Sequence, residues 1–134
     1  MSNRPLPTPT AETAFYWESA KAGKLVIQKC DACHTLQFYP RQFCIACLSE
    51  SLDWIEAAGT GTIYTFTVNH RAANEYMKDK TPYVVAAIDL DEGVRMLANI
   101  VNSNIAEVAC GKAVQVVFEK ASEDITLPQF RLVT

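Results

Sequence analysis

Four cysteines at regular spacing are the residues of this chain best suited to chemistry. Cys30 and Cys33 form one Cys-x-x-Cys pair, and Cys44 and Cys47 form a second pair after ten intervening residues. Each pair can supply two thiolates to a tetrahedral metal ion, and the short segment between the pairs brings them together. Four thiolates leave zinc no open position for a water molecule, so this spacing predicts a structural zinc site. Iron is the other metal that four thiolates suit.

The residues around the two pairs help to decide between a metal site and the alternative of two disulfides. The chain starts without the apolar segment of a secretion signal, and it contains no apolar run of the ~20 residues that span a bilayer. We therefore expect a cytoplasmic protein that lies outside the membrane and keeps its thiols reduced. His34 and Leu48 follow the pairs, at positions where a left-handed backbone favours glycine. We expect strain at Leu48 and weaker zinc binding than in glycine-bearing ribbons.

Short apolar strands flank the cysteine pairs. Residues 25–29 run into the first pair, and residues 36–40 run back toward the second. This arrangement predicts a zinc ribbon built on a hairpin, of the rubredoxin-like kind. The chain has 134 residues, a net charge of −3 and 49% apolar residues, which suits one compact unit or a ribbon joined to one small domain. A ribbon this small needs its metal, whereas the rest of the chain can bury an ordinary core.

An extended arm and a helix are expected before the ribbon. Residues 1–9 contain three prolines, and the helix should begin with Thr10 as its N-cap and end at Gly23. Between these ends lie three consecutive aromatic residues, Phe15, Tyr16 and Trp17. Neighbouring residues on a helix point about 100° apart, so the three rings cannot share one face. The helix must cover apolar surface that belongs either to a partner protein or to the ribbon, and both interpretations stay open.

The pattern changes to strands after Gly59. Five β-branched or aromatic segments follow, separated by a polar loop, a tight Asp-Glu-Gly turn and one helical turn. The segments are residues 62–70, 83–90, 94–101, 112–120 and 125–133. This succession is the strand order of an OB-fold barrel. We therefore predict a mainly β protein with an arm and helix over residues 1–24, a zinc ribbon over 25–58 and a five-stranded OB-fold domain over 59–134.

Several short motifs occur in a fixed order along most of the chain. They include Phe15-Tyr-Trp-Glu18, the four cysteines, Gly59-Thr-Gly61, Pro82-Tyr83 and Leu127-Pro-Gln-Phe130. In this order they resemble the domain-of-unknown-function 35 (DUF35) family, in which a rubredoxin-like zinc ribbon is joined to an OB-fold. The resemblance implies a non-catalytic accessory subunit that assembles with a thiolase-like enzyme and supports acyl (acetyl) transfer or other acyl-CoA chemistry. A chain of this size resembles in particular the small subunit of bacterial complexes that acetylate phenolic polyketides.

No motif places together the residues that thiolase chemistry needs. That chemistry uses an activated cysteine and a histidine that takes and returns a proton. Cys110, the cysteine outside the pairs, should be a buried, inert thiol, and His70 lies forty residues before it. His34 should lie at the surface. A solvated turn, and not an acid and base pair, is expected for the hairpin carboxylates, Asp89, Asp91 and Glu92. We expect no catalytic residue in this chain.

A basic and aromatic group of residues could hold acyl-CoA. CoA carries phosphates and an adenine, which bind cations and flat side chains. The candidates lie near the polar loop and across the hairpin turn: Arg71, Lys78, Lys80, Tyr83 and Arg95. The alternative is a loop that is merely exposed to solvent.

Two further functions stay open at this point. The first is a module that binds single-stranded nucleic acid, because zinc ribbons and OB barrels both serve that role. Residues 84–90 and 94–101 contain no aromatic side chain for base stacking, and the net charge is negative, so we expect no nucleic acid. The second is a purely structural bridge between two enzyme subunits, without a ligand.

Overall fold

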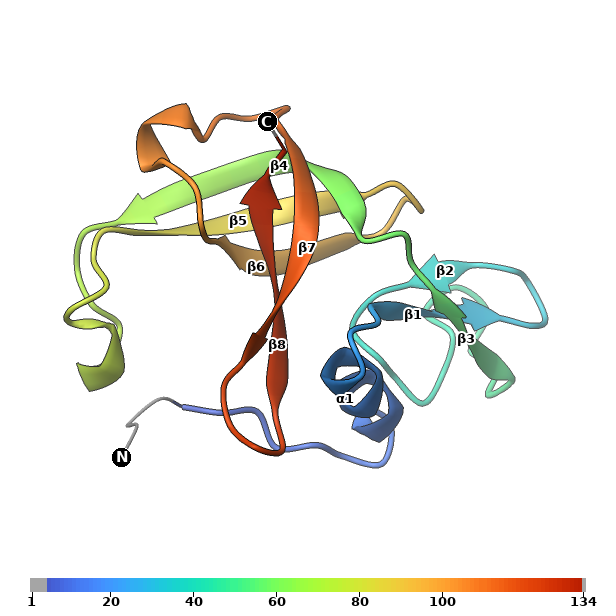
Figure 1. Ribbon diagram of the computed structural model, residues 1–134. Helices are drawn as coiled ribbons and strands as arrows, with labels where there is room; N and C mark the ends of the chain where they lie inside the picture. Colours follow the sequence, from blue (N-terminus) through green and yellow to red (C-terminus); the bar gives the residue numbers. More distant parts are fainter. Residues whose placement is uncertain (1–4, 134) are drawn as a thin grey trace.

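Within residues 5–133, which the computed structural model describes, the chain forms one α-helix, a small three-stranded sheet and a five-stranded barrel (Figure 1). The helix and the ribbon strands are α1 (Ala14–Lys21), β1 (Val26–Cys30), β2 (Leu36–Gln37) and β3 (Leu52–Glu56). The barrel strands and two short 3-10 turns are β4 (Thr60–Asn69), η1 (Glu75–Met77), β5 (Tyr83–Leu90), β6 (Arg95–Ile100), η2 (Ile105–Glu107), β7 (Ala113–Lys120) and β8 (Thr126–Leu132). The predicted mainly β fold class is confirmed.

β1 is the centre of the ribbon sheet, whose strand order is β2-β1-β3. Both neighbours run antiparallel to β1, with Gln28 opposite Gln37 on one side and opposite Trp54 on the other. The sequence predicts a strand over residues 36–40, but β2 ends at Gln37, and Tyr39 just beyond it has a left-handed φ of 67°. The ribbon therefore has little sheet of its own and depends on other contacts for its stability.

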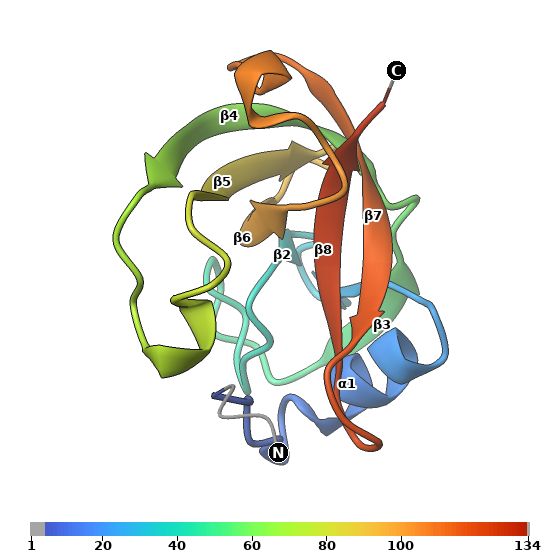
Figure 2. The same cartoon turned by 60° about the vertical axis from the view of Figure 1, so that its left-hand side comes forward.

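The remaining strands close a barrel in the order β4-β5-β6-β8-β7, with β7 returning to β4 (Figure 2). β6 and β8 run parallel, whereas the other neighbouring strands are antiparallel. The seam between β6 and β8 has a single backbone pair, Ile100 with Phe130, while β5 and β6 pair at six positions. This order confirms the predicted OB-fold barrel.

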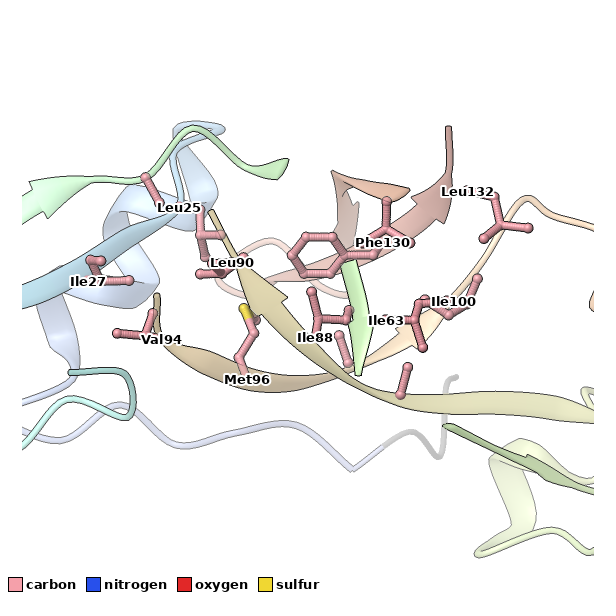
Figure 3. Close-up of a cluster of buried hydrophobic side chains, with 14 of the residues drawn as sticks. Leu25, Ile27, Ile63, Ile88, Leu90, Val94, Met96, Ile100, Phe130 and Leu132 are labelled. Carbon is pink, nitrogen blue, oxygen red and sulfur yellow. The ribbon is translucent and has the colours of Figure 1, made fainter. Parts of the chain in front are cut away.

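One apolar core joins the barrel to the ribbon. Ile63, Ile88 and Phe130 are almost fully buried inside the barrel (Figure 3). The same cluster continues through Leu25 and Ile27, which lead into the ribbon sheet. Burying one such side chain contributes about 1.5–3 kcal/mol. The ribbon is therefore held against the barrel by shared core packing as well as by the chain that connects them.

α1 begins later than the sequence predicts and ends where it predicts. Thr10 is not the N-cap, because its hydroxyl lies 3.0 Å from the Thr13 hydroxyl, and the helix starts one residue after Thr13. At the other end Gly23 has a left-handed φ of 83°, and the N–H of Lys24 donates to the carbonyl of Ser19. This is the glycine cap that closes many helices. In the described part of the chain, no helix is long and apolar enough to cross a membrane.

Candidate functional site

The four cysteines of the two pairs meet where β1 ends. Their sulfur atoms all lie within 4.8 Å of one another. The Sγ atoms of Cys30 and Cys47 are 3.6 Å apart, as are those of Cys33 and Cys44. Tetrahedral zinc with Zn–S bonds of about 2.3 Å would hold two sulfur ligands about 3.8 Å apart. The cluster therefore fits one zinc ion with four thiolate ligands, and the predicted metal site is confirmed.

Hydrogen bonds lower the pKa of Cys30 and Cys33, whereas the neighbouring cysteine sulfurs raise the pKa of Cys47. A backbone N–H two residues after Cys30 donates to its sulfur at 3.3 Å, and the same contact occurs at Cys44. The Thr35 hydroxyl lies 3.1 Å from the sulfur of Cys33, and this hydrogen bond lowers the pKa of the Cys33 thiol to about 6. Zinc binds thiolates and not thiols, so these donors prepare the site for metal.

Two buried glutamines, which the sequence analysis did not single out, hold the second cysteine pair in place. Gln28 Oε1 accepts hydrogen bonds from the N–H of Arg41 at 2.9 Å and from the Gln37 amide at 2.7 Å. Gln37 Oε1 accepts the N–H of Ile45 at 3.0 Å. Each glutamine lies within an apolar ribbon strand, and this could have identified both from the sequence. A buried amide needs hydrogen-bond partners, so a glutamine at such a position indicates a buried polar contact.

His34 and Leu48 adopt the left-handed backbone that their positions predict. Their φ angles are 64° and 65°. A left-handed conformation costs a residue with a Cβ about 1–2 kcal/mol. The Leu48 side chain is 75% exposed, so little packing offsets this cost. The predicted left-handed backbone after each cysteine pair is confirmed, and the strain that it implies at Leu48 stays a prediction.

The three aromatic residues of α1 have different surroundings. Tyr16 is buried with its ring 5.6 Å from that of Phe38, and burial raises the pKa of its phenol. Trp17 is half-buried and packs edge-on against Tyr16 at 4.9 Å. Phe15 is 48% exposed and lies against Trp54, with ring centroids 5.2 Å apart. Packing on the ribbon accounts for Tyr16, whereas Phe15 keeps apolar surface open to solvent.

Arg95 lies apart from the other candidates for acyl-CoA binding. Its guanidinium donates to the Asp89 carboxylate at 2.6 Å and stacks over the Tyr64 ring at 3.5 Å. The hydrogen bond from Arg95 lowers the pKa of Asp89. Arg95 pairs with Asp89 near the end of β5, whereas Tyr83 begins that strand, roughly 20 Å away at ~3.3 Å per residue. The structure does not bring Arg95 to the β4–β5 loop.

The β4–β5 loop brings two of the remaining candidates together. The Lys80 ammonium lies 4.7 Å from the centre of a tyrosine ring of η1, and Lys80 and Tyr83 line one cavity of about 270 Å³. Lys78 is exposed and forms a salt bridge of 2.9 Å with a carboxylate of η1. Arg71 is exposed in the same loop. Lys80 and Tyr83 are therefore the pair that share a surface.

The hairpin carboxylates lie in an exposed turn, as the sequence predicts, and two of them also accept hydrogen bonds from the chain near the start of β4. Asp91 accepts a hydrogen bond from the Thr60 hydroxyl, and Glu92 Oε2 accepts one from the N–H of Ala58 at 2.9 Å. Ala58 lies in the segment between β3 and β4, and Thr60 is the first residue of β4. The turn between β5 and β6 therefore fastens this segment to the barrel.

Cys110 is exposed, which corrects the prediction of a buried thiol. Val108, at the end of η2, takes the buried position, and Cys110 lies in the turn that follows. The N–H of Gly111 donates to the carbonyl of Ile63 at 2.7 Å, so Cys110 lies beside the first half of β4. His70 follows the other end of β4, roughly 23 Å along the strand at ~3.3 Å per residue. The structure does not bring this thiol and this imidazole together.

Replacing Cys44 by Ser should release the zinc and unfold the ribbon, because metal binding supplies the folding energy of such modules. Metal analysis of the purified chain should show a fall from one zinc per chain to background. Cys110→Ser is the matched control, since it removes an exposed thiol outside the cluster and should keep the zinc. A Cys44→Ser chain with its full zinc content would contradict the four-thiolate site.

Replacing Leu48 by Gly should stabilise the zinc-loaded chain by about 0.5–1 kcal/mol, because relief of the left-handed strain exceeds the entropy cost of glycine. Urea unfolding measures the change, and zinc release to a chelator should slow in parallel. Ile45→Gly is the control, since Ile45 lies in the same loop, is 60% exposed and has no left-handed φ. That control should lose stability, and an equal loss at Leu48 would show that its backbone is not strained.

Comparison with known proteins matches both parts of the chain. Residues 17–53 match the rubredoxin-like zinc ribbon domain of ChsH2, and residues 54–119 match the C-terminal OB-fold domain of ChsH2. The probable enoyl-CoA hydratase alpha subunit of Thermomonospora curvata is 39% identical over 128 residues, which are 96% of this chain. The chain spans only 40% of the length of that relative.

Two other similar proteins are matched over most of their own length. A DUF35 domain-containing scaffold protein of Methanocaldococcus jannaschii is 35% identical over 101 residues, which cover 75% of this chain and 71% of the relative. A chain in the solved structure of the Ltp2-ChsH2(DUF35) aldolase is 37% identical, with a TM-score of 0.87 over 96% of this chain and 100% of that one. The chain therefore belongs to the DUF35 family, with a zinc ribbon and an OB-fold of the ChsH2 type.

Proposed function

We propose that this chain is a non-catalytic, zinc-binding accessory subunit that assembles with a thiolase-like enzyme subunit and supports acyl-CoA chemistry. The observation that carries the proposal is the match over the whole DUF35 chain of the Ltp2-ChsH2 aldolase. The relative from M. jannaschii is named a scaffold, and the one from T. curvata a hydratase subunit. A supporting role beside another subunit is consistent with all three names, and the name of the T. curvata relative supports acyl-CoA as the substrate class.

The chemistry of the described residues supports an accessory role. Four thiolates occupy every position around the metal, so the zinc stabilises the ribbon and does not activate water. A thiolase-type nucleophile needs a base within hydrogen-bond reach. Cys110 and His70 lie at different places along β4, as described above. The reacting groups are therefore assigned to the partner subunit.

The CoA part of a substrate is assigned to the β4–β5 loop. Lys80 and Tyr83 line one cavity there and offer a cation and a flat ring, with Arg71 and Lys78 exposed nearby. Phosphates bind such cations by charge-assisted hydrogen bonds, and adenine stacks on aromatic rings. Arg95 takes no part in this assignment, because Asp89 and Tyr64 already hold it.

The surface assigned to the partner subunit is the exposed side of α1. Phe15 presents apolar surface there beside Trp54, and aromatic side chains are typical anchors of interfaces. Tyr16 and Trp17 serve this surface indirectly, because they fix α1 to the ribbon. The same surface would serve a subunit that bridges two enzymes without binding a substrate.

Replacing Phe15 by Ala should weaken the complex at least about tenfold, the loss that corresponds to about 1.4 kcal/mol. The measurement is the intact mass and metal content of the protein isolated from its own host under mild conditions. Wild-type protein should come with thiolase-like chains and one zinc per copy, and Ile45→Ala should keep this complex. A zinc-loaded monomer from wild-type cells would contradict the accessory-subunit proposal, whereas a complex that survives Phe15→Ala would remove only the assigned surface.

Replacing Lys80 by Ala should raise the KM of the isolated complex for acyl-CoA about tenfold, because a charge-assisted hydrogen bond contributes about 1.5–3 kcal/mol. The kcat and the mass of the complex should stay the same. Lys112→Ala is the matched control, since Lys112 is an exposed lysine outside the loop. Equal KM values for the two variants would exclude the β4–β5 loop from CoA binding.

A further inference from the structure

A cavity of about 540 Å³ lies where the helix, the ribbon and the barrel meet. α1 contributes Trp17 to its lining, the ribbon contributes Tyr39, and β6 and β8 contribute Leu97 and Gln129. Figure 1 shows α1 between β8 and the ribbon strands, which is the place where these three parts meet. Sites for small molecules usually measure about 300–1,000 Å³. The cavity is therefore of the size that holds a small molecule.

The cavity exists because the barrel seam is open along part of its length. β6 and β8 share the single pair Ile100 and Phe130. Beyond it, side chains replace backbone pairing: Gln129 Oε1 accepts the N–H of Asn99 at 2.8 Å. The Tyr39 hydroxyl accepts the N–H of Leu97 at 3.3 Å. The ribbon thus covers a part of the barrel wall where the two strands have separated.

The walls of the cavity are aromatic and preformed. The rings of Tyr16 and Trp17 are 4.9 Å apart, those of Tyr16 and Phe38 are 5.6 Å apart, and those of Phe38 and Tyr39 are 4.7 Å apart. All four side chains line the cavity. Each ring is held by the next, so binding would require little ordering of side chains.

The lining selects the charge of the ligand. Among residues 5–133, no side chain that lines the cavity belongs to Asp, Glu, Lys, Arg or His. A buried charge without a partner is costly, so phosphates and carboxylates are disfavoured there. The amides of Asn99 and Gln129 lie at the barrel side, where Asn99 donates to the carbonyl of Val84 and Gln129 donates to Asn99. Each amide nitrogen has a second N–H, which can bond to a carbonyl or a hydroxyl. In the lining, Leu97 is 60% exposed and Tyr39 is 47% exposed. A ligand that covers their apolar surface would therefore gain binding free energy from its burial.

We propose that this junction cavity binds an uncharged, apolar small molecule with fused or flat rings, whose polar end faces Asn99 and Gln129. The volume, the aromatic walls and the absence of charge support this ligand class together. The inference goes beyond the proposed function, because it concerns the free chain and requires no partner subunit. It also differs from the assignment of CoA to the β4–β5 loop: Asn99 and Gln129 line both cavities, but within residues 5–133 only the loop cavity has a cation, Lys80, in its lining.

The two tryptophans of the sequence allow the site to be located. Trp17 lines the cavity, whereas Trp54 lies against Phe15 and lines other surfaces. The zinc-loaded Trp54→Phe chain therefore reports on the cavity through Trp17 alone, and the Trp17→Phe chain is its counterpart. Progesterone, an uncharged four-ring ketone, is the probe. Its titration should give a saturable change in the emission of Trp17 and at least a fivefold smaller change in that of Trp54.

A charge at the cavity should abolish this binding. Leu97→Glu, made in the Trp54→Phe chain, should raise the Kd for progesterone at least tenfold, because the carboxylate would lose water when the ligand covers it. Ile45→Glu is the matched control, since Ile45 is also 60% exposed but lies outside the lining, and its Kd should stay within twofold. Thermal melts of both variants verify that the fold is kept.

Three results would overturn the proposal: no saturable response of Trp17, a response of the same size from Trp54, or equal Kd values for the two glutamate variants. Free CoA is the second probe, and a Trp17 response to CoA as large as that to progesterone would equally overturn the selection for uncharged ligands. All these measurements use the isolated chain. Their failure is therefore distinct from a failure to find the enzyme complex, which the mass of the native assembly tests.

Discussion

The four sulfur atoms at the end of β1 are the contact on which the rest of the structure depends. The ribbon has a two-residue β2 and a short β3, so its sheet alone cannot offset the entropy of ordering the loops that carry the cysteines. A metal with four thiolate ligands closes both loops at once. Once closed, the ribbon presents Leu25 and Ile27 to the barrel core. The orientation of α1, and with it the aromatic cluster, follows from this arrangement.

The features that the sequence predicts are those whose cause is local. Cysteine spacing within a pair determines which ligands can reach one metal ion, and Gly23 ends the helix through its own backbone. The five barrel strands could be predicted because β-branched segments alternate with turn residues, and a closed OB order is a common way to pair them. The left-handed conformation of Leu48 was predictable for the same reason, since it depends only on its place after the second pair.

The features that the sequence does not predict depend on which segments meet in space. The apolar neighbours of Cys110 in the sequence suggested a buried thiol, but in the structure Val108 is the residue that is buried there. In the sequence, Arg95 and Lys80 look like members of one basic group. In the structure they lie near opposite ends of β5, because Lys80 precedes the strand and Arg95 is paired with Asp89 near its end. In the sequence, Gln28 and Gln37 look like ordinary strand residues. Only the structure shows that their amide oxygens accept hydrogen bonds from the chain around the second cysteine pair. The start of α1 was misplaced because the hydroxyl of Thr10 bonds to the hydroxyl of Thr13, and only the carbonyl of Thr10 accepts the N–H of Ala14.

The aromatic cavity shares a wall with the metal-dependent part of the chain, and this gives the two sites a thermodynamic coupling. Phe38 and Tyr39 belong to the loop between β2 and the second cysteine pair, so this wall is ordered only when the ribbon is. If bound zinc raises the affinity of the cavity for its ligand by some factor, the bound ligand must raise the affinity for zinc by the same factor. A ligand in the cavity would slow the escape of the metal, and scarcity of the metal would lower the apparent affinity for the ligand. Zinc supply would thereby set the fraction of chains whose cavity is formed and able to bind the proposed ligand.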